Sequence, residues 1–454
     1  MSTPYILVIV VAGVSLLLFM VLRLKISAFI SLLITSMLVG IMSGMPLEVV
    51  IDSIQKGMGG TLGFVAVVVG LGAIFGQILE ASGGAESLAH HLIRKFGKEK
   101  ASWAMVITGF LVAIPVFLDV GLIILVPIIY ALSRDTKRSL LYYGIPLLAG
   151  LAVTHSFIPP TPGPIAVAEI LDAQLGWVIF FGFILGFPTA VIAGPVFGKY
   201  ISKKIHLNPP EDFVIASDES SEDNEQKLPS FGLIAALIAV PLVLILINTF
   251  TSVAVDQDIF NRSLFTDILI FMGHPFSALI IAALMAIYFL GIRRGRTRQE
   301  LLDLSTKALG PAGIIILITG AGGVLKQILV DSGIGEMMAR SIGDSSMPPI
   351  LLAWLLAAIV RVTQGSATVA MITAAGIIAP VMDFLDPGPP ELALIVLAIA
   401  SGATLLSHVN DSGFWLVSKY FGMDEKQTLR SWTVMESIIA FCGLGLTLLA
   451  GLFV

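Results

Sequence analysis

The chain of 454 residues is 56% hydrophobic and 13% charged, with a formal net charge of −5 and a mean hydropathy of +0.96. Soluble domains carry about 25% charged residues, so this composition excludes an ordinary soluble protein and predicts an integral membrane protein. The one cysteine, Cys442, excludes an internal disulfide.

A series of apolar stretches follows along the chain, and most are about as long as a membrane-spanning helix. The first is expected to be a retained helix, because no basic residue precedes Arg23, as a signal peptide would require. The stretches lie near 4–22, 26–45, 60–80, 103–132, 140–172, 175–200, 230–250, 273–291, 307–330, 348–382, 391–418 and 431–453.

Basic residues in the loops predict the orientation of these stretches, because short loops rich in Lys and Arg stay in the cytoplasm. Arg23 and Lys25 place the first loop there. A loop at 46–59 is then expected outside, and the basic loop at 82–101 is expected inside.

The loop at 133–139 is basic as well, although a single crossing at 103–132 would put it outside. A re-entrant hairpin over 103–132 removes this conflict, since about thirty residues can form two half-membrane helices. Its polar tip is expected at 114–121. A second hairpin over 348–382, with its tip at 363–366, then enters from the opposite side of the membrane.

The predicted fold is an all-α integral membrane protein built from two repeats of inverted topology. The first repeat covers 1–204 and the second covers 230–454, and a polar cytoplasmic linker at 205–229 joins them. Each repeat contains full transmembrane helices, one hairpin and one unwound helix. The unwound helices are expected at about 140–172 and 391–418.

A sequence repeat at a distance of about 250 residues supports this division. Chance similarity between apolar helices does not account for Gln, Ser and Glu shared at fixed positions. Duplicated hydrophobic halves are typical of secondary transporters with a substrate site between the repeats. The first copy comprises Gly70, Gly72, Gln77-Ile78-Leu79, Ser82-Gly83, Glu86 and Ala89, and the second comprises Gly320, Gly322, Gln327-Ile328-Leu329, Ser332-Gly333, Glu336 and Ala339.

Polar or proline-rich residues interrupt four of the apolar stretches, at 117–121, 154–164, 363–368 and 407–413. The four prolines within 159–164 prevent a helix, because each removes an N–H and clashes with the preceding turn. Unwound backbone at membrane depth is tolerated where it is buried or lines a wet cavity. The N-termini of half-helices favour an anionic ligand, so these interruptions predict a binding site for an anion.

Five ionisable residues lie in or beside these interruptions, where an isolated charge costs about 2.5–3.5 kcal/mol. Asp119 and Asp411 are expected either to handle a proton or substrate, or to cap a broken helix. His155 and His408 occupy equivalent places, and each either titrates near neutral pH or holds unwound backbone as a neutral group. Arg361 either binds a carboxylate with both ends of its guanidinium or forms a salt bridge to one of the two aspartates.

Other ionisable residues near the ends of apolar stretches are expected at the membrane interface. These are Glu80, Glu169, Lys326 and Glu436. His90-His91 lacks the further ligands that a metal site needs, so no metal site is predicted.

The same segments give the chain a resemblance to the gluconate permease family, the gluconate:proton symporters, over nearly its whole length. The resemblance implies a transporter of the bacterial inner membrane, not an enzyme, that imports gluconate or a related sugar acid with protons. It also implies membership of the ion transporter superfamily, with paired hairpins, elevator-type movement and a homodimer, and neither a cofactor nor a nucleic-acid partner is expected. It is strongest at Gly59-Gly60-Thr61-Leu62-Gly63, Asp119-Val120-Gly121, 154–164, 365–370 and 407–415.

Two positions depart from the family pattern. Thr161 stands where many members have a histidine, and Ser412 stands where many have a proline. Because relatives carry D-serine or keto-sugar acids, and a histidine is lost from the site, the exact substrate stays open.

The substrate is expected between the two hairpin tips and the two unwound segments. The coupled proton is expected on Asp119 or Asp411, with His155 or His408 as a relay. A sodium-coupled carrier stays open, because unwound carbonyls and hydroxyls can bind Na⁺. An intramembrane hydrolase with Ser366 as nucleophile lacks the closing glycine of the Gly-x-Ser-x-Gly motif. The substrate-binding candidates are Ser156, Thr161, Arg361, Gln364, Gly365, Ser366, Thr368, Asn410 and Ser412.

Overall fold

The computed structural model describes residues 3–209, 228–343 and 347–454, without the side chains of 3–7, 10, 22 and 339–343. Most of the predicted linker, 210–227, therefore lies outside the described residues. Every regular element in the described ranges is helical, and eight helical stretches there are long and apolar enough to cross a membrane. The prediction of an all-helical, multi-pass membrane protein is confirmed.

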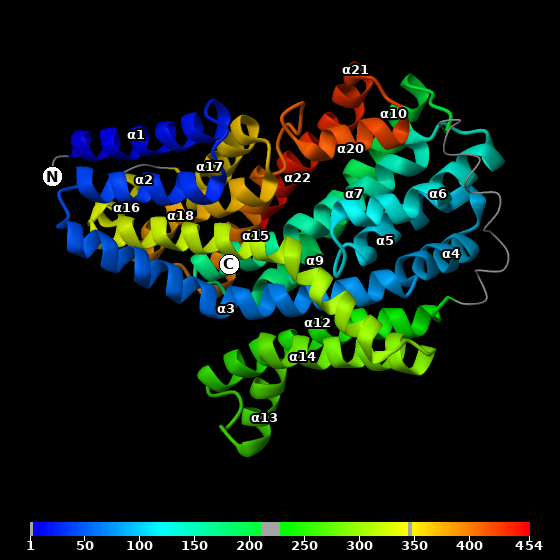
Figure 1. Cartoon of the computed structure of the whole chain (residues 1–454), viewed down its shortest axis with the longest axis horizontal. Coiled ribbons are helices and arrows are strands. Elements are labelled where there is room, and N and C mark those ends of the chain that lie inside the picture. The colour runs from blue at the N-terminus through cyan, green and yellow to red at the C-terminus, as the bar shows by residue number, and fades with distance from the viewer. Residues whose placement is uncertain (1–2, 210–227, 344–346) are drawn as a thin grey trace.

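The described helices follow in the order shown in Figure 1. The first half contains α1 (Thr3–Leu22), α2 (Ala28–Met42), α3 (Leu47–Ala81), α4 (Gly84–Phe96), α5 (Ala101–Val112), α6 (Leu118–Thr136), α7 (Leu141–Phe157), α8 (Pro162–Ile170), α9 (Leu175–Val191) and α10 (Phe197–Lys204). The second half contains α12 (Phe231–Asp256), α13 (Leu264–Gly273), α14 (Pro275–Ala286), α15 (Arg298–Asp331), α16 (Ile334–Gly343), α17 (Pro349–Gln364), α18 (Ala367–Leu385), α19 (Pro389–Gly402), α20 (Ser412–Phe421), α21 (Glu425–Thr428) and α22 (Val434–Ala450). Short connecting turns are η1 (Lys98–Lys100), η2 (Ile192–Val196), η4 (Ile287–Gly291), η5 (Ile292–Arg294) and η6 (Leu429–Thr433).

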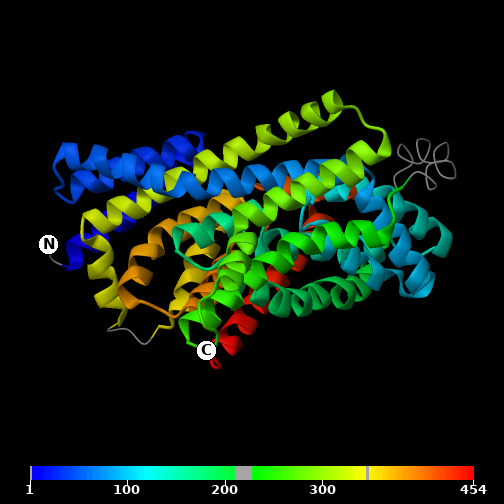
Figure 2. The ribbon, with the colours of Figure 1, turned by 90° about the horizontal axis from the view of Figure 1, so that it is seen from below.

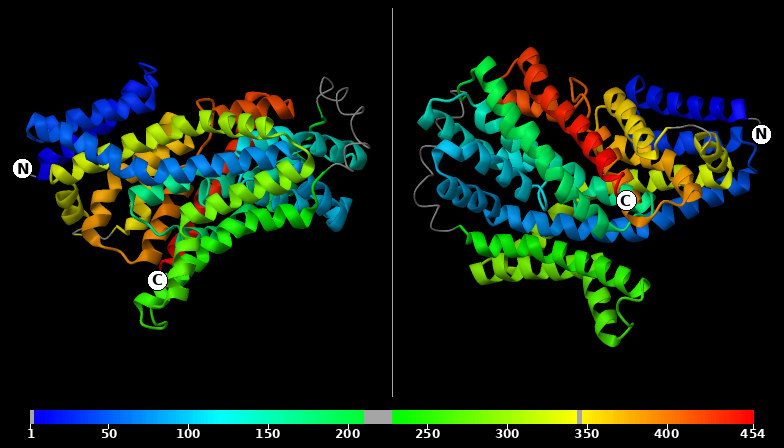
Figure 3. Two further views of the ribbon diagram at one scale, coloured as in Figure 1. Left: turned by 60° about the horizontal axis from the view of Figure 1, so that its bottom comes forward. Right: turned by 180° about the vertical axis from the view of Figure 1, so that it is seen from behind.

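The two longest helices, α3 and α15, pack along each other and run antiparallel. Gly57 of α3 lies against the backbone of Gly323 in α15, whereas Gly70 faces Leu309, near the opposite end of α15. A Cβ at Gly57 would lie 2.6 Å from the Gly323 carbonyl oxygen, so only glycine permits this approach. Figures 2 and 3 show α3 running from beside α2 and α1 to the cyan helices of the first half.

Helix α3 begins earlier than the sequence predicted, and the loop expected at 46–59 is wrong. Charged residues such as Glu48 lower the hydropathy of this stretch, but they lie on the exposed face of the helix. Ser53 and Gly57 lie on its buried face, and the Ser53 hydroxyl donates to Asp331 Oδ2 of α15 at 2.5 Å. Packing against α15 therefore extends the helix beyond its apolar part.

Helices α12, α13 and α14 form a layer on one side of α3, with α13 projecting from it (Figure 1). Within this layer α12 packs on α14, and α14 packs on α3. The layer contacts the rest of the molecule mainly through α3, α9 and α4.

Helices α7, α8, α18 and α19 form the centre of the molecule and are buried on nearly all sides. Their residues are apolar around the whole circumference, as expected of helices surrounded by protein. The two halves of the chain are in contact there, because α18 of the second half packs on α8 of the first. Helix α20 of the second half also packs on α6 of the first.

The helices end at or beside the four polar interruptions singled out in the sequence. Helix α5 ends before Pro115 and α6 begins after it, and α7 ends at Phe157, just before the Pro159-Pro160 pair. Helix α17 ends at Gly365, whose φ of +82° lies in the left-handed region that favours glycine. Residues 403–411 separate α19 from α20. These four breaks bring the candidate site residues to the helix ends.

Candidate functional site

In the second half of the chain, a buried ion pair joins the tip between α17 and α18 to the segment between α19 and α20. Arg361 is 3% exposed and donates to Asp411 Oδ2 at 2.5 Å and to the carbonyl oxygen of Gly365. The two segments touch, since a Cβ at Gly365 would overlap the backbone carbonyl of Asn410. We call the Arg361, Gly365 and Asp411 contact the latch.

The Asp411 carboxylate is held on several sides. It is the N-cap of α20 and accepts from the Gly413 N–H at 3.0 Å. The Ser407 hydroxyl donates to its other oxygen, and Trp432 Nε1 donates to Ser407 at 2.6 Å. The sequence left open whether Asp411 handles a proton or substrate or caps a helix, and whether Arg361 binds a substrate carboxylate or an aspartate. In the structure, Asp411 caps α20 and forms a salt bridge with Arg361.

His408 and Asn410 hold the end of α17. His408 Nε2 lies 3.0 Å from the Val362 carbonyl oxygen, and Asn410 Nδ2 donates to the same oxygen at 3.0 Å. Asn410 also donates to the Thr363 carbonyl at 3.3 Å. These contacts satisfy carbonyl groups that a helix leaves unpaired at its C-terminus.

The remaining candidates of the second half surround the same tip. Ser366 is the N-cap of α18, and its hydroxyl accepts from the Val369 N–H at 3.4 Å. Thr368 lies in the first turn of α18, and Ser412 is exposed at the start of α20. The Gln364 side chain is half-buried, and its two buried polar atoms, Oε1 and Nε2, have no hydrogen-bond partner.

In the first half, Asp119 and His155 form a separate pair. Asp119 is exposed in the first turn of α6, and its charge acts on His155 in the last turn of α7. The His155 ring lies 6.0 Å from the Phe117 ring, and its Nδ1 is buried without a partner. Ser156 is buried beside it in α7.

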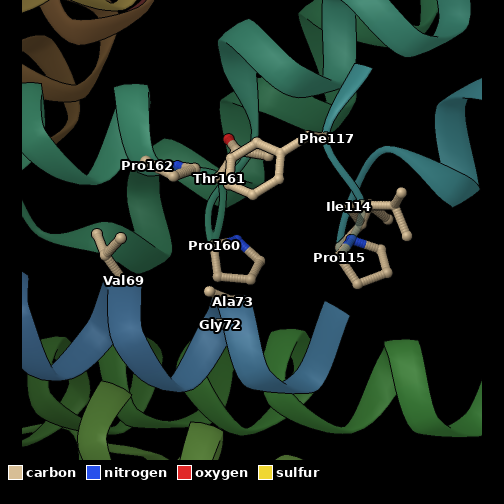
Figure 4. A pocket seen from close by; sticks show the side chains of 10 residues that line it. Val69, Gly72, Ala73, Ile114, Pro115, Phe117, Pro160, Thr161 and Pro162 are labelled. Atoms are coloured by element: carbon tan, nitrogen blue, oxygen red, sulfur yellow. The ribbon is translucent and has the colours of Figure 1, made fainter. Parts of the chain in front are cut away.

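A narrow cleft lies between α3, the α5–α6 tip and the α7–α8 break (Figure 4). Thr161 lines it, and its hydroxyl donates to the Ile158 carbonyl at 2.6 Å. The cleft has a volume of about 20 Å³, which holds a water molecule but no larger ligand. Its other lining residues are Val69, Gly72, Ala73, Ile114, Pro115, Val116, Phe117, Pro160 and Pro162.

Buried polar atoms without a hydrogen-bond partner gather at these breaks. Among the described residues they are Thr154 Oγ1, His155 Nδ1, Arg361 Nε, Gln364 Oε1 and Nε2, and Glu436 Oε1, with Thr35, Trp177 and Thr373 elsewhere. Such atoms are rare in folded proteins, and most of those found here lie at or near the helix breaks.

The prediction that Glu436 lies at the membrane interface is wrong. Its side chain is 4% exposed, and the charges that act on it are those of Arg361 and Asp411. The apolar stretch in the sequence begins at 431, but the helical rod begins at Glu425, so Glu436 lies about 16 Å from its start. A lone carboxylate inside an apolar stretch was the available signal, and its position near the end of that stretch hid its burial. Ser407 and Trp432 were likewise missed as site residues.

Comparison with known proteins identifies the family. The model of the GntP family permeases matches residues 5–453. The chain is 44% identical over 430 residues to a gluconate permease of Pseudomonas aeruginosa, covering 95% of this chain and 94% of the relative. It is 40% identical over 449 residues to a gluconate permease of Bacillus subtilis, covering 99% and 100%.

The fold is shared with a solved transporter of much lower sequence identity. The structure of Neisseria gonorrhoeae MtrF, from a class of antimetabolite efflux pumps, matches with a TM-score of 0.65 at 15% identity. The match covers 92% of this chain and 93% of MtrF. The resemblance noted in the sequence is therefore confirmed, and the chain belongs to the GntP family of permeases, which are transporters and not enzymes.

Proposed function

We propose that this permease imports gluconate or a related sugar acid together with a proton across the bacterial inner membrane, by an elevator-type alternating-access mechanism. The observation that carries the proposal is the gathering of unpartnered buried polar atoms at the helix breaks. Such atoms are costly at membrane depth. A ligand with hydroxyl groups and a carboxylate supplies the hydrogen bonds that they lack, and relatives named gluconate permeases point to the same class of ligand.

The proposed membrane arrangement has two inverted repeats, with re-entrant hairpins formed by α5–α6 and α17–α18. Helix α5 has 12 residues and α17 has 16, so they are about 18 and 24 Å long. Both are shorter than the hydrocarbon core of about 30 Å. The antiparallel pair α3 and α15, one from each half, fits repeats of opposite orientation.

The proposed substrate site lies at the half-helix N-termini. Thr161 precedes α8, Ser366 precedes α18 and Asp411 precedes α20, so each of these helices begins at a break and directs the positive end of its dipole toward it. The Gln364 amide offers one donor and one acceptor to hydroxyl groups. Arg361 is assigned to the latch, which positions these groups. The other proposed contacts are Ser156, Gly365, Thr368, Asn410 and Ser412.

The elevator proposal rests on two observations: the cleft is too narrow for the substrate, and its walls pack against α3. A cleft of about 20 Å³ must open before it admits a sugar acid. The α5–α6 tip and the α7–α8 break meet α3 at glycines, with Gly76 against Pro115 and Gly72 near Pro160. We propose that α3, α15 and the α12–α14 layer stay fixed while the hairpins and broken helices move along them.

The proton-coupling groups suggested by the sequence differ in their surroundings. Asp411 is already in an ion pair, and His408 already contacts a backbone carbonyl of α17. Asp119 is exposed, and His155 has an unpartnered nitrogen, so these two are the open candidates of the original four.

The test is uptake of labelled gluconate into proteoliposomes at a clamped membrane potential. A pH gradient, acidic outside, should drive accumulation without sodium, and one proton per substrate gives about tenfold accumulation per pH unit. A protonophore should abolish it. A strict requirement for sodium would refute proton coupling, and failure of gluconate and other sugar acids to exchange would refute the substrate class.

A further inference from the structure

The carboxyl group of Glu436 is a buried ionisable group without an assigned role. Its side chain is 4% exposed, and its Oε1 has no hydrogen-bond partner. Helix α22, which carries it, packs on α17 and α19 of the second half and on α7 and α9 of the first half. Trp432, one turn earlier in the same rod, donates to Ser407, and Ser407 donates to Asp411. Glu436 therefore lies inside the protein, next to the latch.

Two charged groups act on Glu436 from the surrounding elements. Arg361 is presented by α17, and Asp411 is presented by the break before α20. Among the described residues of α7, α9, α19, η2 and η6, no further charge is found to act on it. The three groups thus form one charge cluster.

The charge balance of this cluster depends on Glu436. The single positive charge of Arg361 is already matched by Asp411 at 2.5 Å. An ionised Glu436 would leave one uncompensated negative charge inside the protein, whereas a protonated Glu436 leaves the cluster neutral. When Glu436 gains or loses a proton, Arg361, the one cation in the cluster, must therefore change its contacts to compensate the charge.

We propose that Glu436 binds the proton that is transported, and that its charge state controls the latch. The inference rests on the proposed function and names its coupling residue. With the proton bound, Arg361 stays on Asp411 and Gly365, and the α17–α18 tip stays tied to the broken helix. When the proton leaves on the same side as the substrate, the Glu436 carboxylate competes with Asp411 for Arg361, and the loosened tip allows the empty carrier to return.

Burial distinguishes Glu436 from Asp119 in this role. A transported proton must be enclosed with the substrate while the site changes sides. Asp119 is exposed, so no part of the described structure encloses a proton bound to it. Glu436 is enclosed and is the group whose charge bears on the contact between hairpin and broken helix.

The test compares Glu436→Gln with wild type in proteoliposomes. Counterflow of labelled gluconate at equal pH measures substrate binding and movement, and an entrapped pH-sensitive dye measures proton entry. E436Q should retain counterflow but lose substrate-driven acidification and the tenfold accumulation per pH unit. Glu425→Gln, at the exposed start of the same rod, should behave as wild type in all assays.

Several outcomes would overturn the inference. Undiminished proton entry in E436Q is one, and loss of counterflow in folded E436Q, which would indicate a purely structural role, is another. If E436Q does not fold, Glu436→Asp decides, since a proton-binding carboxyl should shift the pH midpoint of counterflow and an unchanged midpoint contradicts the role. Absence of gluconate exchange in wild type would instead refute the proposed function.

Discussion

Removing one partner of the Arg361–Asp411 ion pair should destabilise the permease more than removing both. The two side chains are 3% and 11% exposed, so Asp411 alone would be a buried, unpaired charge, and Arg361 alone would have only Glu436 as a counter-charge. Breaking such a pair costs about 3–5 kcal/mol, whereas neutral replacement of both partners is often nearly neutral. Asp411→Asn keeps a side chain that can cap α20, so this substitution removes mainly the charge.

The double-mutant cycle uses Arg361→Met, Asp411→Asn and the combined variant. From these energies, each single variant should lose about 3 kcal/mol or more of its free energy of unfolding. The interaction energy between the two positions should be at least about 2 kcal/mol. Thermal unfolding in detergent, monitored by tryptophan fluorescence, should give the double variant a higher unfolding temperature than either single variant. Arg361→Lys is the matched control, because it keeps the charge but loses the planar fork that reaches both Gly365 and Asp411.

Strictly additive losses in this cycle would refute the latch. They would mean that Arg361 and Asp411 act independently, and Arg361 would then be free to bind the substrate carboxylate directly. In that case Arg361→Lys should raise the KM for gluconate while leaving the unfolding temperature unchanged.

Two glycines give further predictions that use transport and stability as readouts. Gly76→Ala places a Cβ in the carbonyl group of Pro115, so overpacking of about 1–3 kcal/mol and a strong loss of uptake are expected. The control, Gly59→Ala in the same helix, meets no atom within 4 Å and should keep wild-type uptake with equal or higher stability. Equal uptake by the Gly76 and Gly59 variants would refute the close contact between Gly76 and Pro115. Gly365→Ala combines a positive φ with overlap onto Asn410, so the latch should fail and counterflow should fall at least tenfold, and normal counterflow would contradict this.

The class and family of the protein were predictable because their signals are distributed along the chain. Composition alone identifies an integral membrane protein, and the motifs of the broken segments identify the family. The positions of the helix ends were visible for a local reason. The adjacent prolines Pro159-Pro160 follow the end of α7, and the left-handed φ of Gly365 ends α17, so both helix ends have a local cause.

The errors concern burial, which depends on distant parts of the chain. The 46–59 loop was predicted from its charges, but its buried face meets α15, which lies about 270 residues away in sequence. Arg361 and Asp411 are 50 positions apart, and the sequence left open whether Arg361 would meet Asp119, Asp411 or the substrate. Glu436 was judged by its distance from the end of an apolar stretch, and no local pattern reports that α17 and α19 enclose it.

The two halves share a sequence repeat, but their breaks carry different chemistry, and this bears on mechanism. In the second half, Arg361, Asp411 and Glu436 form one buried cluster that ties a hairpin tip to a broken helix. In the first half, the equivalent break is built from prolines, and its ionisable groups are the exposed Asp119 and His155, whose Nδ1 has no hydrogen-bond partner. On the proposed mechanism, the proton-controlled contact lies at the α17–α18 tip, because that tip carries the buried charge cluster whose balance depends on one proton. On the same proposal, the α5–α6 tip, which lies against α3 at Gly76, follows the movement and does not control it.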